Sequence, residues 1–199
     1  MKHAWLIVPL LLAGCVDLKA GYPERRFYTL SVERSGTAAA PAKDGVLRVR
    51  RFTASKLSEG TELVSRTGES EYESDFYNAF FVPPAMQLTE QTHRWMGASG
   101  LFLAVVGTGS SIPETHVLEG NVISLHLDQR EHHREAVLEL QFMLVRVAGD
   151  PSAVVFQKSY KGTEVWGLDG GAKAWNVILQ RILAELEADL TKVDRSIRK

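Results

Sequence analysis

Three long segments rich in apolar residues follow one another in the carboxyl-terminal half, at residues 117–127, 136–147 and 153–165. Successive side chains of a strand point to opposite faces, so alternate apolar residues share one face. The middle segment has this pattern over five positions, at Ala136, Leu138, Leu140, Phe142 and Leu144. Short sequences suited to chain reversal, at residues 128–134 and 149–152, join the three segments. The pattern therefore predicts an antiparallel three-stranded meander with one face in the core.

Two other segments have the three-to-four spacing of apolar residues that is typical of a helix packed on one side. The first is predicted to begin at Pro83-Pro84, because proline fits the first turn of a helix, and to end at about Ser99. The second follows Gly170-Gly171 and extends for about 24 residues. Its single apolar stripe consists of Trp175, Ile178, Leu179, Ile182, Leu183, Leu186, Leu190 and Val193.

Shorter segments complete the predicted sheet. Residues 27–32 and 46–52 are predicted strands, and residues 62–67 and 71–77 form a polar hairpin at a sheet edge. The continuous apolar run at residues 101–106 is predicted to be a strand in the sheet interior. The predicted fold class is therefore α+β, a mostly antiparallel sheet with a three-strand C-terminal meander, packed against two amphipathic helices.

The amino terminus has the layout of a signal peptide. Lys2 precedes an apolar run at residues 4–12, and the small residues Ala13 and Gly14 lead to Cys15. That run is too short to cross a bilayer as a helix, which needs about 20 residues. Residues 12–15, Leu-Ala-Gly-Cys, resemble a lipobox, at which a lipoprotein signal peptidase cuts just before the cysteine. An ordinary secretory signal with an incidental cysteine is the alternative.

The lipobox resemblance implies that Cys15 carries covalent diacylglycerol on its thiol and an acyl group on its amine, and we expect no other cofactor. Cys15 is the only cysteine in the chain, so no intramolecular disulfide can form. Several acyl chains on one residue anchor a protein durably on a membrane. The sequence thus predicts a signal peptide at residues 1–14, a lipidated tether at residues 15–26 and a single domain at residues 27–199.

The residue after the cysteine bears on location. By resemblance to the sorting rule of proteobacterial lipoproteins, Asp in that position retains a protein on the inner membrane, but here Val16 stands there and Asp17 follows. The periplasmic face of the outer membrane is therefore favoured. The chain contains 23 Lys and Arg against 24 Asp and Glu, a balance that gives no broad electropositive surface for nucleic acid.

Aromatic residues cluster between the predicted hairpin and the first predicted helix, at Phe76, Tyr77, Phe80 and Phe81. Such a cluster could line a lipid groove or a protein interface, because exposed apolar patches usually mark binding sites. Core packing is the simpler interpretation, because aromatic residues dominate cores as well. Trp166, at the end of the last predicted strand, has the same two interpretations.

One histidine pair is the nearest approach to a metal site. His132 and His133 are flanked by Glu131 and Glu135 in a predicted turn. Adjacent strand residues point to opposite faces, and zinc requires three or four converging ligands, so we interpret the pair as a solvated turn. Neither a metal site nor a nucleophile motif is indicated, and we predict that the protein is not an enzyme.

Over nearly the whole mature chain, these features resemble the ABC-type transport auxiliary lipoprotein family, which includes PqiC-type proteins. After the lipobox, the matching motifs are Phe-Tyr-Thr-Leu at 27–30, Leu-Arg-Val at 47–49, Leu-Val-Ser-Arg at 63–66, Glu-Tyr-Glu-Ser-Asp-Phe-Tyr at 71–77 and Thr-His-Arg-Trp at 92–95. The chain departs from the family pattern at Phe80-Phe81, where many members have a tryptophan.

The family resemblance implies an accessory protein that works beside ABC transporter subunits and a substrate-binding protein of the mammalian-cell-entry (MCE) type. Phospholipid or another apolar molecule would be the cargo, and a homo-oligomer is compatible with this role. The alternative is an envelope-assembly or scaffold lipoprotein that binds another protein or a cell-wall component and has no transport role.

Overall fold

The computed structural model describes residues 24–36, 45–131, 133–167 and 171–197. The predicted signal peptide and Cys15 lie outside these residues. The described elements, in chain order, are β1 (Arg26–Tyr28), β2 (Val46–Val49), β3 (Thr53–Ala54), the 3-10 turn η1 (Lys56–Ser58), β4 (Glu62–Arg66), β5 (Tyr72–Phe80), α1 (Pro84–Ser99), β6 (Ala104–Val106), β7 (His116–Asp128), β8 (Glu135–Arg146), β9 (Ala153–Val165) and α2 (Ala172–Ile197).

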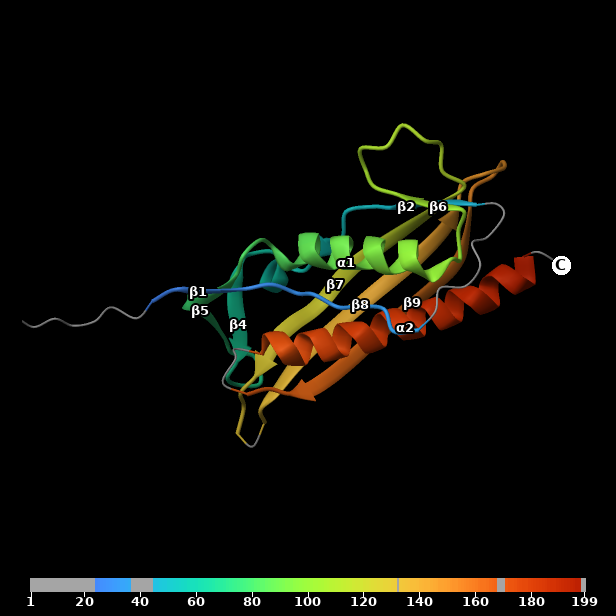
Figure 1. Ribbon diagram of the computed structural model, residues 1–199. Helices are drawn as coiled ribbons and strands as arrows, with labels where there is room; N and C mark the ends of the chain where they lie inside the picture. The colour runs from blue at the N-terminus through green and yellow to red at the C-terminus, as the bar shows by residue number, and fades with distance from the viewer. Residues whose placement is uncertain (1–23, 37–44, 132, 168–170, 198–199) are drawn as a thin grey trace, which may run out of the picture.

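The strands form one mixed sheet around β7 (Figure 1). Along one edge of β7, β2, β3 and β4 pair with it in turn, all parallel. Along its other edge β8 pairs antiparallel, and β9 continues the meander. Antiparallel pairing thus makes the long ladders, and parallel pairing adds the short strands. The predicted α+β architecture, with its meander and two helices, is confirmed.

Both helices pack on one face of the sheet, and the core lies between the layers (Figure 1). All of the predicted stripe of α2 from Trp175 to Leu190 is buried. The indole Nε1 of Trp175 donates a hydrogen bond of 3.1 Å to the carbonyl oxygen of Val137, which ties α2 to β8. Gly162 of β9 permits this close packing, because a Cβ atom there would lie 2.5 Å from a methyl carbon of Ile178.

The first helix begins and ends where the sequence predicts. Pro84 occupies its first turn, and Gly100, with a φ of 74°, ends it in the left-handed conformation that glycine adopts without strain. The predicted hairpin is also present as β4 and β5. It lies near one end of the sheet, with only the three residues of β1 beyond it.

The predicted strand at residues 27–32 is only partly formed. Residues 26–28 pair with β5, and residues 29–34, here called the strap, run along the two helices (Figure 1). Side-chain amides of the helices replace a neighbouring strand. The Leu30 N–H donates to Gln87 Oε1 at 2.6 Å, and the Val32 N–H donates to Gln91 Oε1 at 3.1 Å. Arg34 then forms a bidentate ion pair with Glu187 of α2, with N···O distances of 2.9 and 2.8 Å.

Two other strand predictions need correction. The apolar run 101–106 was predicted in the sheet interior, but only Ala104–Val106 forms a strand, β6, and it lies at the end of the sheet order beside β2. Leu103 is 56% exposed, because residues 101–103 form a bend after the helix rather than a strand. The predicted strand 46–52 ends at Val49, after which the chain bends before β3.

Candidate docking surface

Five side chains form one exposed cluster at the end of the sheet where the described chain begins. We call Arg25, Phe27, Phe76, Tyr77 and Phe81 the N-terminal aromatic patch. Exposed fractions are 68% for Phe81, 67% for Phe76, 54% for Phe27 and 41% for Tyr77. At about 200 Å² for a whole aromatic side chain, the exposed aromatic area is roughly 450 Å². This area is in the range of the largest apolar patches on soluble monomers, which are often functional.

Contacts between the side chains make the patch continuous. The rings of Phe27 and Phe81 meet edge to face, with their centroids 6.1 Å apart. The Arg25 guanidinium carbon lies 5.3 Å from the Phe27 centroid and 5.2 Å from the Phe76 centroid, within the range of a cation–π contact. The rings of Phe76 and Tyr77 are 5.3 Å apart. Arg25 therefore joins the aromatic side chains of β1 to those of β5.

A bulge in β5 exposes Phe76 and Tyr77 together. Neighbouring residues of a regular strand point to opposite faces. The register between β4 and β5 shifts at residues 62–63, so residues 76–78 have no partners on β4. The Asp75 carboxylate closes the bulge by accepting the Tyr77 N–H at 2.8 Å, the Asn78 N–H at 3.0 Å and the Asn78 side-chain amide at 2.7 Å. Bulges of this kind re-aim side chains, often at functional positions.

The structure separates the residues of the predicted aromatic cluster. Phe76, Tyr77 and Phe81 are on the surface, whereas Phe80 is 1% exposed and packs on Trp175 in the core, with ring centroids 5.3 Å apart. Phe80 is therefore not part of a binding surface. Trp166 is partly buried against the core, and the Arg134 guanidinium lies 4.8 Å from its ring centroid.

Sequence reasoning missed Arg25 and Phe27 as patch residues. Phe27 was interpreted only as part of a strand, and Arg25 as part of the tether. Their place depends on the parallel pairing of β1 with β5, which aligns Phe27 with Ala79. Because these strands are about 50 residues apart in the chain, no local pattern could have indicated the contact.

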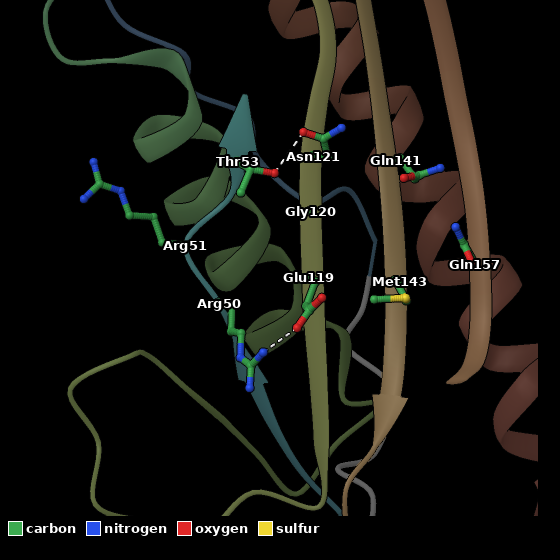
Figure 2. A pocket seen from close by; sticks show the side chains of 9 residues that line it. All are labelled: Arg50, Arg51, Thr53, Glu119, Gly120, Asn121, Gln141, Met143 and Gln157. Carbon is green, nitrogen blue, oxygen red and sulfur yellow. Dashed lines mark hydrogen bonds and ion pairs between the residues drawn. The ribbon is translucent and has the colours of Figure 1, made fainter. Parts of the chain in front are cut away.

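The sheet face that the helices leave uncovered contains a hollow of about 380 Å³ (Figure 2). Its lining side chains are mostly polar, and several of them contact one another. Arg50 pairs with Glu119, and the Thr53 hydroxyl donates to Asn121 Oδ1 at 2.9 Å. Specific pockets for small ligands are mostly apolar with a few converging polar groups. Four of these polar side chains are paired with one another, so we assign no ligand to the hollow.

Two charged clusters have structural explanations. Arg130 donates two hydrogen bonds to Asp128, of 2.9 and 2.6 Å, and lowers the pKa of that carboxyl to about 2. The pair fixes the chain where it leaves β7.

The second cluster lies between β9 and α2. Asp189 accepts hydrogen bonds from Lys158 at 2.6 Å, Lys192 at 2.8 Å and the Tyr160 hydroxyl at 3.0 Å. The Lys158 and Lys192 bonds lower the pKa of Asp189, and burial raises the pKa of Tyr160.

Within the described ranges, no three His, Cys, Asp or Glu side chains converge as metal ligands would. His133 is exposed, and His132, the other member of the predicted turn pair, lies outside those ranges. Neither of the two described helices combines the length and apolar character needed to span a bilayer.

Solved structures share this fold. A Xanthomonas campestris protein of family DUF330 has a TM-score of 0.74 at 17% identity, over 87% of this chain and 98% of its own. An uncharacterised protein has a TM-score of 0.56 at 16% identity, over 85% and 99% of the two chains. A hypothetical protein from Chlamydia trachomatis has a TM-score of 0.55 at 10% identity, over 76% and 98%. At these identities the likeness shows the fold alone.

No family model and no curated protein matches the chain. The prediction that it belongs to the ABC-type transport auxiliary lipoprotein family is wrong as an assignment, because the solved structures that share the fold are a DUF330 protein and an uncharacterised protein. The named family among the three structures is DUF330, and these structures carry no description of a function. The matching motifs at residues 63–66 and 71–77 lie in the two strands of one hairpin.

Proposed function

We propose that the protein is a lipid-anchored auxiliary component of an intermembrane lipid transport system of the ABC and MCE type. It acts by docking and has no catalytic step. The observation that carries the proposal is the position of the N-terminal aromatic patch. The patch begins at Arg25, where the described chain enters the fold after the tether from the predicted lipid anchor at Cys15. A chain that enters the fold beside an exposed apolar surface suits a protein that works at a membrane.

The charged clusters support docking over catalysis. A catalytic carboxylate needs a partly open site with an acid or base partner at hand. Asp189 instead uses its oxygens to join β9 to α2, and Asp128 is held by Arg130. In the hollow on the open sheet face, Arg50 pairs with Glu119 and Thr53 with Asn121. Each of these groups has a structural task.

The cellular setting follows from the anchor. The lipid on Cys15 would place the domain on the periplasmic face of the outer membrane, within reach of an MCE-type substrate-binding protein and ABC transporter subunits. Phospholipid is the proposed cargo. The protein, a single domain, would work as a monomer or as a homo-oligomer. An envelope scaffold with no transport role would use the same anchor and would differ only in its partners.

The test is purification of the full-length lipidated protein from its native membranes in mild detergent, with mass spectrometry of the retained proteins and lipids. Cys15→Ala serves as the unanchored control. Retention of MCE-type or ABC subunits by the wild type, and their loss from Cys15→Ala, is the expected result. Retention of cell-wall or assembly factors alone would replace transport with the scaffold role.

A further inference from the structure

We propose that the N-terminal aromatic patch inserts into the headgroup region of the same bilayer that holds the lipid on Cys15. The inference rests on the proposed anchor and adds a second membrane contact, which fixes the orientation of the domain. Without such a contact, a domain on a single tether would turn freely above the membrane.

The tether enters the fold beside the patch. Eleven residue-to-residue steps lead from Cys15 to Arg26, and an extended chain covers at most about 3.3–3.6 Å per residue, so β1 begins within about 40 Å of the anchor. The helix α2 has 26 residues and is about 39 Å long at 1.5 Å per residue. It points away from the β1 and β5 end of the molecule (Figure 1). The patch is therefore the part of the described surface next to the tether, and the far end of the fold is a control position away from it.

The chemistry of the patch matches the membrane interface. Aromatic rings concentrate in the headgroup region, where an apolar body meets a wet, polar boundary. Arg25 lies over two of the phenyl rings, and Arg26 beside it is exposed. Guanidinium groups form strong paired hydrogen bonds with phosphate, so these two side chains can hold lipid phosphates while the rings enter below them.

The Asp75 carboxylate, which precedes Phe76 in the chain, is used within the bulge. Asp75 accepts three hydrogen bonds from Tyr77 and Asn78, which satisfy its oxygens and hold the bulge. The Tyr28 hydroxyl donates to Asn78 Oδ1 at 3.0 Å and joins the bulge to β1. These hydrogen bonds hold the backbone that carries the rings of Phe76 and Tyr77.

A patch of this size needs the anchor to work. On its own, a few exposed rings bind a membrane weakly and reversibly. Once the lipid on Cys15 holds the chain, the patch meets the bilayer at a high effective concentration, so weak contacts suffice to set an orientation.

The test uses a single added thiol. Because lipid occupies the sulfur of Cys15, the chain's only cysteine, a new cysteine becomes the only site for an environment-sensitive dye. Tyr77→Cys places the dye in the patch and keeps its three phenylalanines. Leu103→Cys, at a residue 56% exposed beside β6, is the matched position at the far end. Both lipidated proteins are reconstituted in phosphatidylethanolamine–phosphatidylglycerol vesicles that contain nitroxide-labelled lipid, after intact mass confirms the lipid.

The expected result is a blue shift and severalfold stronger nitroxide quenching at position 77 than at position 103. The double substitution Phe76→Ser and Phe81→Ser in the Tyr77→Cys protein should abolish the difference while circular dichroism stays unchanged. Equal quenching at both positions in lipidated protein would overturn the bilayer contact and leave the proposed function intact. Shielding at position 77 only after transport subunits are added would assign the patch to a protein partner instead. Absence of lipid in the intact mass would overturn both proposals.

Discussion

Gln87 of α1 holds the strap, and its replacement by methionine should release that segment. Its Oε1 accepts the Leu30 N–H at 2.6 Å, and its Nε2 donates to the Val82 carbonyl at 2.8 Å. Methionine has a similar length and volume, so packing is retained while both hydrogen bonds are lost. Leaving a buried backbone group without a partner costs about 1–3 kcal/mol. Water can reach the partly buried Val82 oxygen, so most of the cost falls on the Leu30 N–H, and we expect a total of about 2–3 kcal/mol.

The assay is hydrogen exchange by mass spectrometry on a lipid-free chain that begins at residue 15 and carries Cys15→Ser. If the strap opens without global unfolding, 2–3 kcal/mol corresponds to exchange about 30- to 150-fold faster over residues 29–34. Gln157→Met, on the exposed side of β9, is the matched control and should leave strap exchange unchanged. Wild-type exchange rates over residues 29–34 in Gln87→Met would refute the role of the helix amides in holding the strap.

Three further predictions concern stability. A Cβ atom on Gly120 would lie 2.5 Å from the Phe52 ring, so Gly120→Val should lower the free energy of unfolding in urea by about 1–3 kcal/mol, and an unchanged midpoint would contradict this packing. The folded-state pKa of Asp128, about 2, is below the usual 3.8. Its ionised form therefore adds about 1 kcal/mol, after solvent screening, to the free energy of unfolding above pH 4, and this contribution disappears as the pH falls through 2. The stability difference between wild type and Asp128→Asn should shrink over that window, and a constant difference would contradict the prediction. Phe80→Ala should cost about 3–5 kcal/mol in thermal unfolding, whereas Phe81→Ala should cost less than about 0.5 kcal/mol, and similar losses would contradict their different burial.

The parts of the fold that sequence could predict are those with long local periodicity. The meander and α2 each repeat one pattern over many residues, so their faces could be assigned before the structure was known. The short parallel strands have no such pattern. The placement of β2, β3 and β4 along β7 depends on contacts between segments far apart in the chain. The strap depends on Gln87 and Gln91, whose amides replace a strand partner.

The candidate surface shows the same limit at the scale of single residues. The sequence indicated an aromatic cluster but could not separate Phe80, in the core, from Phe81, on the surface. That separation follows from the alternation of neighbouring side chains at the end of β5, whose pairing with β1 sets which of the two faces the core. An aspartate just before two aromatic residues near a proline pair is the local signal that could have suggested the bulge.

The lipid on Cys15 is the feature on which both the docking role and the bilayer contact depend. Intact mass spectrometry of the protein extracted from its own membranes measures it directly. The predicted result is a chain that begins at Cys15 and carries the added mass of a diacylglyceryl group and an acyl chain. A chain that begins at another residue, or that retains an unmodified cysteine, would contradict it.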